Sequence, residues 1–329
     1  MSKDTFISFP TEDNEKHVVP NLKVLCIGLA VVDTMLICYS FPSEDSDVRC
    51  KDQRIQAGGN AVNNCTVLSA LGVTCEYMGY LSNCHYSKMI TEHLKKCGIH
   101  FENCVYREGD SVFPNSSVIV NNQNGSRTIM HFRKNWPEVT LEDFKKLDLS
   151  QYSWVHFEGR NVEEIRKMVS WIDCWREANP VSSLRVSIEI EKPRPDLVDL
   201  LPIGDVLFIG KDFSRFRGYV TMAEVLEKVT PLIKKNATVI VPWGELGATA
   251  RNPDGEVVHS PAFPPQKVVD TLGAGDTFCA AVISALNSKH SLKDSIVFGC
   301  QVAGAKVGMY GYDGLDIFCN KTSKAYLVS

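Results

Sequence analysis

Short apolar runs that alternate with helix-like segments constrain the fold of this chain more than any other feature. The first run, Val24 to Val32, stays apolar until Asp33, as expected for a strand covered on both faces of a sheet. Comparable runs recur at residues 73–81, 154–157, 186–190, 206–209 and 238–241, with helical patterns between them. This alternation predicts an α/β fold with a central, mostly parallel β-sheet flanked by helices on both faces.

A glycine-rich stretch precedes an apolar helical pattern that starts near Ala274. Gly273, Ala274 and Gly275 then lie at the helix N-terminus, where unpaired backbone N–H groups and the helix dipole favour a phosphate group. Asp276 follows in the first turn and is a candidate base for the proton of an attacking hydroxyl group in phosphoryl transfer. The alternative is an ordinary helix entry, in which glycine serves a turn and aspartate complements the dipole.

Other nucleotide-binding motifs are missing from the sequence. The stretch Gly273-Ala274-Gly275 lacks the third glycine of a dinucleotide-binding fingerprint. The pair Gly210-Lys211 is followed by Asp212 instead of Ser or Thr, so it does not form a P-loop. Phosphoryl transfer, if this chain performs it, therefore depends on a different phosphate site.

Polar residues near two other predicted element ends suit a polyhydroxylated ligand. Asp33 ends the first apolar run, where it either binds a ligand or caps the strand. Gly58 and Gly59 open a helix whose first turn carries Asn60 and Asn63 on one face. Their amides each offer a donor and an acceptor to sugar hydroxyls, the alternative being simple helix capping by Asn60.

Two loops are candidates for binding a nucleotide. An Asn-Gly turn at residues 124–125 predicts a β-hairpin over residues 117–132. Arg127 follows this turn, where it either binds a phosphate group or is a solvated charge at the edge of the sheet. Gly244 and Gly247 follow the apolar run at 238–241, where they form either a nucleotide-edge loop or a tight turn.

Composition limits the remaining classes of function. The net charge of −4 and the lack of a Lys/Arg cluster argue against nucleic-acid binding. No apolar run is long enough to span a membrane. We expect residues 1–22 to form a polar, flexible extension, and they lack the apolar centre of a signal peptide. We therefore expect a cytoplasmic protein. The twelve cysteines are scattered and form no C-x-x-C pair, which indicates reduced thiols. Cys97, His100 and Cys104 offer three possible zinc ligands, one fewer than a structural zinc site needs.

Two motifs resemble the signatures of the ribokinase-like carbohydrate kinases: Gly58-Gly59-Asn60 with Asn63, and Asp270-Thr271-x-Gly273-Ala274-Gly275-Asp276. Further stretches are similar to fructose-phosphorylating members of this family, at residues 44–46, 118–129, 156–161, 191–194 and 298–304. The similarity runs from about Val24 to about Gly314. It implies a ribokinase-like domain over residues 23–329, with a small β-sheet lid formed by about 35–57 and 113–133.

The resemblance also implies an activity, the ATP-dependent phosphorylation of fructose at its 1-hydroxyl group. It makes Asp276 the base and places Gly273, Ala274 and Gly275 at the anion hole. The residues it implies for sugar binding are Asp33, Asp45, Gly59, Asn60, Asn63 and Asp276. Those it implies for ATP are Arg127, Gly244, Glu245, Leu246, Gly247 and Cys300, together with the anion hole.

The resemblance further implies Mg²⁺ carried by the phosphates, K⁺ held near Asp270, and a homodimer paired through the lid. The chain departs from the family where Gly210-Lys211-Asp212-Phe213 replaces the metal-associated N-x-x-E motif. It departs again at Phe132–Trp136, which is bulkier and more basic than the resemblance leads us to expect. A kinase for another ketose or a nucleoside, and a catalytically silent sugar-binding protein, are the alternatives.

Overall fold

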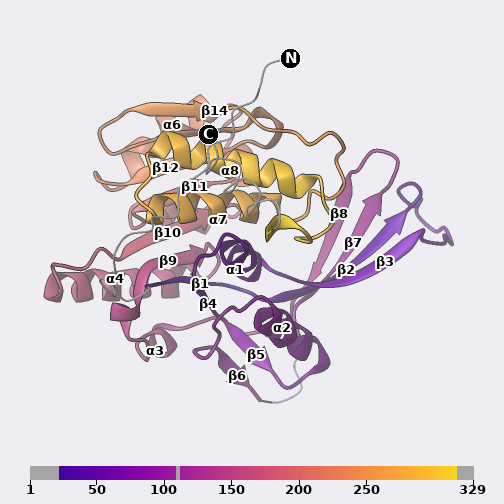
Figure 1. Ribbon diagram of the computed structural model, residues 1–329, viewed down its shortest axis with the longest axis horizontal. Helices are drawn as coiled ribbons and strands as arrows, with labels where there is room; N and C mark the ends of the chain where they lie inside the picture. Colours follow the sequence, from indigo (N-terminus) through magenta and orange to yellow (C-terminus); the bar gives the residue numbers. More distant parts are fainter. Residues whose placement is uncertain (1–21, 109–111, 317–329) are drawn as a thin grey trace, which may run out of the picture.

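An eight-stranded sheet forms the centre of the molecule (Figure 1). The computed structural model describes residues 22–108 and 112–316, so most of the predicted extension at residues 1–22 lies outside the described part. The strands from β12 to β4 run parallel, whereas β13 and β14 are antiparallel to their neighbours. In spatial order they are β14 (Val257–Ser260), β13 (Ala248–Arg251), β12 (Thr238–Pro242), β11 (Val206–Ile209), β10 (Arg185–Ile190), β9 (Tyr152–Glu158), β1 (Lys23–Ile27) and β4 (Cys75–Met78).

Helices cover both faces of this sheet because successive strand residues point to opposite sides. In β1, Val24 and Cys26 join one apolar core while Leu25 and Ile27 join the other. The first core is covered by α1 (Asn60–Ala70), α2 (His85–Lys96), α7 (Ala274–Asn287) and α8 (Leu292–Val307). The second is covered by α3 (Leu141–Phe144), α4 (Val162–Ala178), α5 (Lys211–Phe216) and α6 (Met222–Val229). The predicted α/β architecture is confirmed.

A four-stranded sheet projects from this body and is here called the lid sheet (Figure 1). Its order is β3 (Asp52–Gly58), β2 (Val31–Cys38), β7 (Asn115–Asn121) and β8 (Arg127–Phe132). Strands β7 and β8 are antiparallel, which confirms the hairpin predicted from the Asn-Gly turn. A third, two-stranded sheet joins β5 (Tyr80–Ser82) to β6 (Val105–Arg107).

Two predicted strands are each divided between two sheets, so those predictions were wrong. The run at residues 24–32 leaves the central sheet after Ile27 and enters the lid sheet at Val31. The run at 73–81 similarly supplies both β4 and β5. Each break lies at a glycine, Gly28 or Gly79, and a Cβ there would lie 2.5 Å or 2.0 Å from a neighbouring side chain. Apolar periodicity cannot separate two such strands, because both sheets bury the same residue types.

Candidate active site

A cavity of about 930 Å³ lies between the lid sheet, the N-termini of α1 and α7, and the carboxyl ends of the central strands. Ligands of open α/β sheets bind at such strand ends. The cavity brings together these predicted site residues: Asp33, Gly59, Asn60, Asn63, Arg127, Gly244, Glu245, Gly247, Gly273, Ala274, Gly275, Asp276 and Cys300. Asp45, Leu246 and Asp270 do not line it. Asp45 lies in the exposed connection between β2 and β3, with a left-handed φ of 57°.

The N-terminus of α7 faces this cavity. Gly273 precedes the helix with φ 73°, a conformation that disfavours any residue with a Cβ, and no side chain caps the helix. The Ala274 N–H donates to the Thr271 carbonyl at 3.3 Å, so the turn before the helix is closed by its own backbone. An anion at this end of α7 would meet the positive end of the helix dipole.

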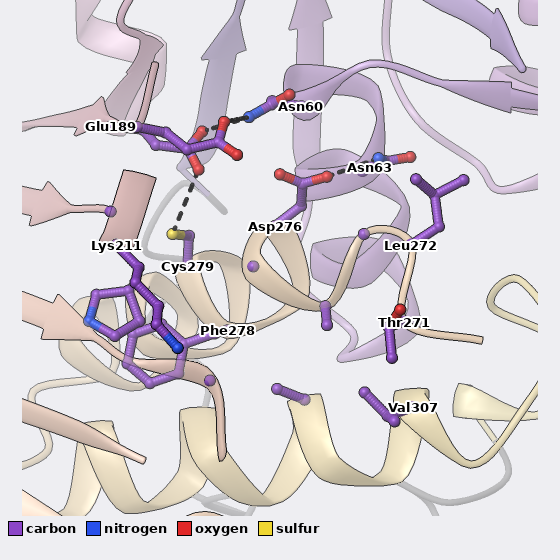
Figure 2. A pocket seen from close by; sticks show the side chains of 18 of the residues that line it. Asn60, Asn63, Glu189, Lys211, Thr271, Leu272, Asp276, Phe278, Cys279 and Val307 are labelled. Atoms are coloured by element: carbon purple, nitrogen blue, oxygen red, sulfur yellow. Dashed lines mark hydrogen bonds between the residues drawn. The ribbon is translucent and has the colours of Figure 1, made fainter. Parts of the chain in front are cut away.

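Asp276 lies in the first turn of α7 and is 8% exposed (Figure 2). Its Oδ2 accepts a hydrogen bond of 2.6 Å from the Asn63 side-chain amide, and its backbone carbonyl accepts one of 3.0 Å from Asn64. Burial, followed by repulsion from Glu191, raises the pKa of Asp276 from 3.8 to about 7. A carboxyl group with such a pKa can take up a proton near neutral pH, as a general base must.

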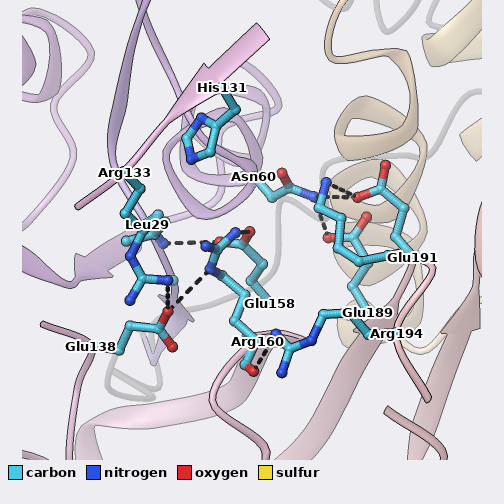
Figure 3. Close-up of polar contacts among 12 residues, drawn as sticks. Leu29, Asn60, His131, Arg133, Glu138, Glu158, Arg160, Glu189, Glu191 and Arg194 are labelled. Carbon is cyan, nitrogen blue, oxygen red and sulfur yellow. Dashed lines mark hydrogen bonds and ion pairs between the residues drawn. The ribbon is translucent and has the colours of Figure 1, made fainter. Parts of the chain in front are cut away.

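The N-terminus of α1 supplies two amides to the cavity. Gly59 precedes this helix with φ 94°, and a Cβ there would lie 2.2 Å from the Leu29 carbonyl oxygen, so only glycine fits. Asn60 makes no capping bond to the helix, which rules out the capping alternative. Its Nδ2 instead donates to Glu189 at 2.9 Å and to Glu191 at 3.1 Å (Figure 2, Figure 3).

Sequence reasoning missed a group of charged residues along the cavity wall. They are Glu158, Arg160, Glu189, Glu191, Lys192 and Lys211. Glu191 pairs with Lys192 at 2.7 Å, and Arg160 pairs with Glu158 at 3.1 Å (Figure 3). Glu189 lies in a strand of otherwise buried residues, and burial raises its pKa well above the usual range. A carboxylate in an apolar run was the signal that could have identified Glu189.

Asp33 and Arg127 reach the cavity from the lid sheet. Burial raises the pKa of Asp33 to about 6, because its effect is larger than that of the hydrogen bond with Ser116, which lowers this pKa. Arg127 opens β8, and its guanidinium contacts the Thr271 hydroxyl in the turn before α7. The lid sheet and the α7 turn therefore meet at one end of the cavity.

Asp270 is neutralised by a lysine of α8. The Lys306 ammonium, which is fully buried, donates to both the Oδ2 and the backbone carbonyl of Asp270 at 3.0 Å. The Gly311 N–H donates to the same Oδ2 at 3.0 Å. The carboxylate expected to lie near a potassium ion therefore already has a cationic partner in this structure.

Four of the residues predicted for the nucleotide, Gly244, Glu245, Gly247 and Cys300, also line the cavity. Gly247 has φ 82°, and a Cβ there would lie 2.0 Å from the Ser260 carbonyl oxygen. Glu245 accepts from Lys211 at 3.0 Å, while Leu246 is 57% exposed. Cys300 of α8 is buried, and burial raises the pKa of its thiol.

Within the described residues, no group of three or more His, Cys, Asp or Glu side chains could hold a metal ion. The same part of the chain contains no helix that is long and apolar enough to cross a membrane.

A cavity that joins a buried carboxylate in the first turn of a helix, the uncapped N-terminus of that helix and two asparagine amides is typical of a phosphotransferase that acts on an alcohol group. The model of the pfkB family carbohydrate kinases matches residues 21–314. The chain therefore belongs to the pfkB family of carbohydrate kinases.

Individual relatives agree with this assignment. The chain is 44% identical to ketohexokinase of Mus musculus over 295 residues, covering 89% of this chain and 98% of the mouse protein. It is 23% identical to ribokinase of Arabidopsis thaliana, over 92% of this chain and 79% of that protein.

Solved structures share the fold at lower sequence identity. The Arabidopsis thaliana ribokinase complex with ribose and ATP superposes with a TM-score of 0.75, at 22% identity, covering 92% of this chain and 99% of that one. The nucleoside kinase of Methanocaldococcus jannaschii superposes with a TM-score of 0.70, at 18% identity, covering 92% and 98%.

Proposed function

We propose that this protein transfers the γ-phosphoryl group of ATP to the 1-hydroxyl group of fructose, giving fructose 1-phosphate and ADP. The observation that carries the proposal is the position of Asp276, a buried carboxylate in the first turn of α7 that faces the same cavity as Asn60 and Asn63. The 44% identity with mouse ketohexokinase supports a ketohexose as the acceptor.

In the proposed reaction, Asp276 accepts the proton of the 1-hydroxyl group while the hydroxyl oxygen attacks the γ-phosphorus. The bond between that phosphorus and the departing ADP oxygen breaks as the new bond forms. Negative charge on the migrating group is stabilised by the N-terminus of α7, beginning at Gly273. Asp33, Gly59, Asn60 and Asn63 are proposed to hold the sugar.

The proposed nucleotide site occupies the other end of the cavity, near residues 244–247 and Cys300. Arg127 is proposed to bind the ATP phosphates, and magnesium supplies further charge neutralisation while bound to them. Potassium is proposed as an activator near Asp270 on the family resemblance alone, since Lys306 already neutralises that carboxylate.

The lid sheet is proposed to pair two copies of this chain, with Asp45 as part of that lid. Support comes from apolar side chains on its strands that are about half exposed and do not line the cavity, namely Ile55, Met130 and Phe132. Large exposed apolar patches commonly mark protein interfaces. Sedimentation analysis of the wild type and of Met130→Lys tests this: a monomeric wild type contradicts the pairing.

We propose the cytoplasm as the location of the protein. The described cysteines are all free thiols, as in a reducing compartment. Fractionation of cells that produce the protein, with enzymatic detection in each fraction, tests this location.

Coupled ADP-release assays on a panel of ketoses, aldoses and nucleosides test the activity, with and without potassium. We expect fructose to give the highest kcat/KM, and Asp276→Asn to retain fructose binding with kcat lowered by orders of magnitude. Asp294→Asn is the matched control, since Asp294 holds the same third position of α8 outside the cavity.

Other outcomes would identify the alternatives. A preference for a nucleoside or another ketose would reassign the acceptor, and the absence of ADP release with every compound would indicate a silent binding protein. A near-normal kcat for Asp276→Asn would overturn the mechanism.

A further inference from the structure

A row of polar side chains crosses the lid sheet above the cavity. In the register of the sheet, Asp33 of β2 lies opposite Ser116 of β7, and Ser116 lies opposite His131 of β8. Directly opposed residues of neighbouring strands share a face of the sheet, and all three residues line the cavity. The lid sheet therefore places His131 at the cavity, a polar residue that was not among the predicted sugar-binding residues.

Hydrogen bonds along this row define the state of the His131 ring. Above its pKa of about 6 Asp33 is ionised and can only accept, so Ser116, which hydrogen-bonds to it, uses its hydroxyl proton there. With its proton directed at Asp33, the Ser116 oxygen keeps lone pairs, so we assign Nδ1 of His131, 3.2 Å away, as the donor in this contact. A neutral imidazole that is protonated at Nδ1 keeps a bare lone pair at Nε2.

The surroundings of His131 keep the ring neutral. His131 is an exposed residue, but partial desolvation by the surrounding protein lowers its pKa below the usual 6.5, and the nearby cations of Arg160, Lys192 and Arg133 lower it further. Figure 3 shows His131 on the lid side, above Arg160 and Glu158 of the cavity wall. Within the described residues, only Nδ1 of this ring has a protein hydrogen-bond partner, so Nε2 is available to a ligand.

Two other residues of this segment, Arg133 and Trp136, have structural partners. Arg133 pairs with Glu138 and donates to the Trp136 carbonyl at 2.8 Å (Figure 3). Trp136 is buried, with its ring 4.9 Å from that of Phe113. Residues 131–136 are all described, and His131 alone among them lines the cavity.

We propose that His131 is a specificity-determining residue, whose Nε2 accepts a hydrogen bond from a sugar hydroxyl group remote from the one that is phosphorylated. This inference rests on the proposed function and extends it, because it assigns a hydroxyl contact to the lid of this chain. A site built to accept from a hydroxyl group discriminates against a sugar that does not present one there.

Steady-state kinetics of His131→Asn, His131→Phe and His131→Gln test the proposal, with fructose and its epimers at C3, C4 and C5. The Asn variant can keep the Ser116 contact but loses the pocket acceptor, the Phe variant loses both, and the Gln amide can place an acceptor near the Nε2 position. We expect the KM for fructose to rise about 3- to 10-fold in the Asn and Phe variants, and less in the Gln variant. The KM for ATP and kcat should change less than twofold.

His259→Asn is the matched control, because His259 also pairs through Nδ1 with a cross-strand hydroxyl, Thr249 at 3.1 Å, but lies outside the cavity. Reduced discrimination between fructose and at least one epimer in the Asn and Phe variants would support the contact. An unchanged KM and unchanged epimer ratios in folded variants of an active enzyme would overturn this inference alone. A wild type that phosphorylates no ketose would instead overturn the proposed function.

Discussion

Replacing Asp276 with asparagine should remove activity and stabilise the unliganded protein at the same time. The substitution keeps the shape of the side chain, and its amide oxygen can still accept from Asn63, which donates to Asp276 at 2.6 Å. What disappears is the negative charge of a side chain that is 8% exposed and faces Glu191. A buried charge that serves catalysis is costly to the fold.

The magnitude follows from the pKa of Asp276, which is 3.8 in its ordinary state and about 7 in the folded protein. Between these values the folded state binds one proton more than the unfolded state, so stability falls as pH rises. Over about 3 pKa units, at about 1.4 kcal/mol each, ionisation of Asp276 costs about 4 kcal/mol. The stabilising effect of Asp276→Asn should therefore be near zero at pH 4 and approach this value above pH 7.

Chemical denaturation of both proteins between pH 5 and pH 8 measures this difference, with Asp294→Asn as the control. Asp294 accepts a hydrogen bond from Ser291 in an exposed contact at the helix start, and an asparagine there can still accept it, so the control should change stability little across this pH range. Equal stability of wild type and Asp276→Asn across this range, or a loss of stability at pH 8, would refute the reasoning. So would full activity of the variant.

Three further predictions follow from the cavity and its surroundings. The kcat/KM for fructose should fall below about pH 7 as Asp276 becomes protonated. It should fall more steeply near pH 6, where Asp33 also becomes protonated. A flat profile from pH 5.5 to 8 would exclude Asp276 as the base. Arg127→Ala should raise the KM for ATP about tenfold or more and that for fructose much less, and equal changes in both would argue against a phosphate contact. Lys306→Met should cost about 3–5 kcal/mol in urea unfolding because it leaves Asp270 unpaired. As a control, Lys146→Met removes an ion pair with Asp143 in which the lysine side chain is 72% exposed. It should lower the free energy of unfolding by less than about 1 kcal/mol.

The motifs of the site were readable from the sequence because each lies at the start of a helix. Gly59 and Gly273 have left-handed φ angles of 94° and 73°, and such positions leave few choices of residue. Asn60, Asn63 and Asp276 follow within one turn, so short-range geometry fixes where their side chains point. These residues were expected at a ligand site, and the structure places all of them around one cavity.

The charged wall was not readable in the same way. Glu158, Glu189 and Glu191 come from two strands and the turn after one of them, and they meet because β9 and β10 are neighbours in the sheet. His131 likewise reaches the cavity only through the pairing of β8 with β7. Their positions depend on strand order and register, which arise from contacts between segments distant in the sequence.

Local patterns in the sequence determined the α/β fold, the hairpin at Asn124-Gly125 and the helix starts that carry the candidate base and amides. These features depend on periodicity, turn chemistry and backbone freedom within a few residues. The tertiary structure alone decided that the run from Val24 to Val32 divides between two sheets, and that Lys306 neutralises Asp270. It also decided that Asp33, Ser116 and His131 form one row over the cavity. The physical reason is that strand pairing and buried ion pairs join residues far apart in the chain, and no local pattern records their partners.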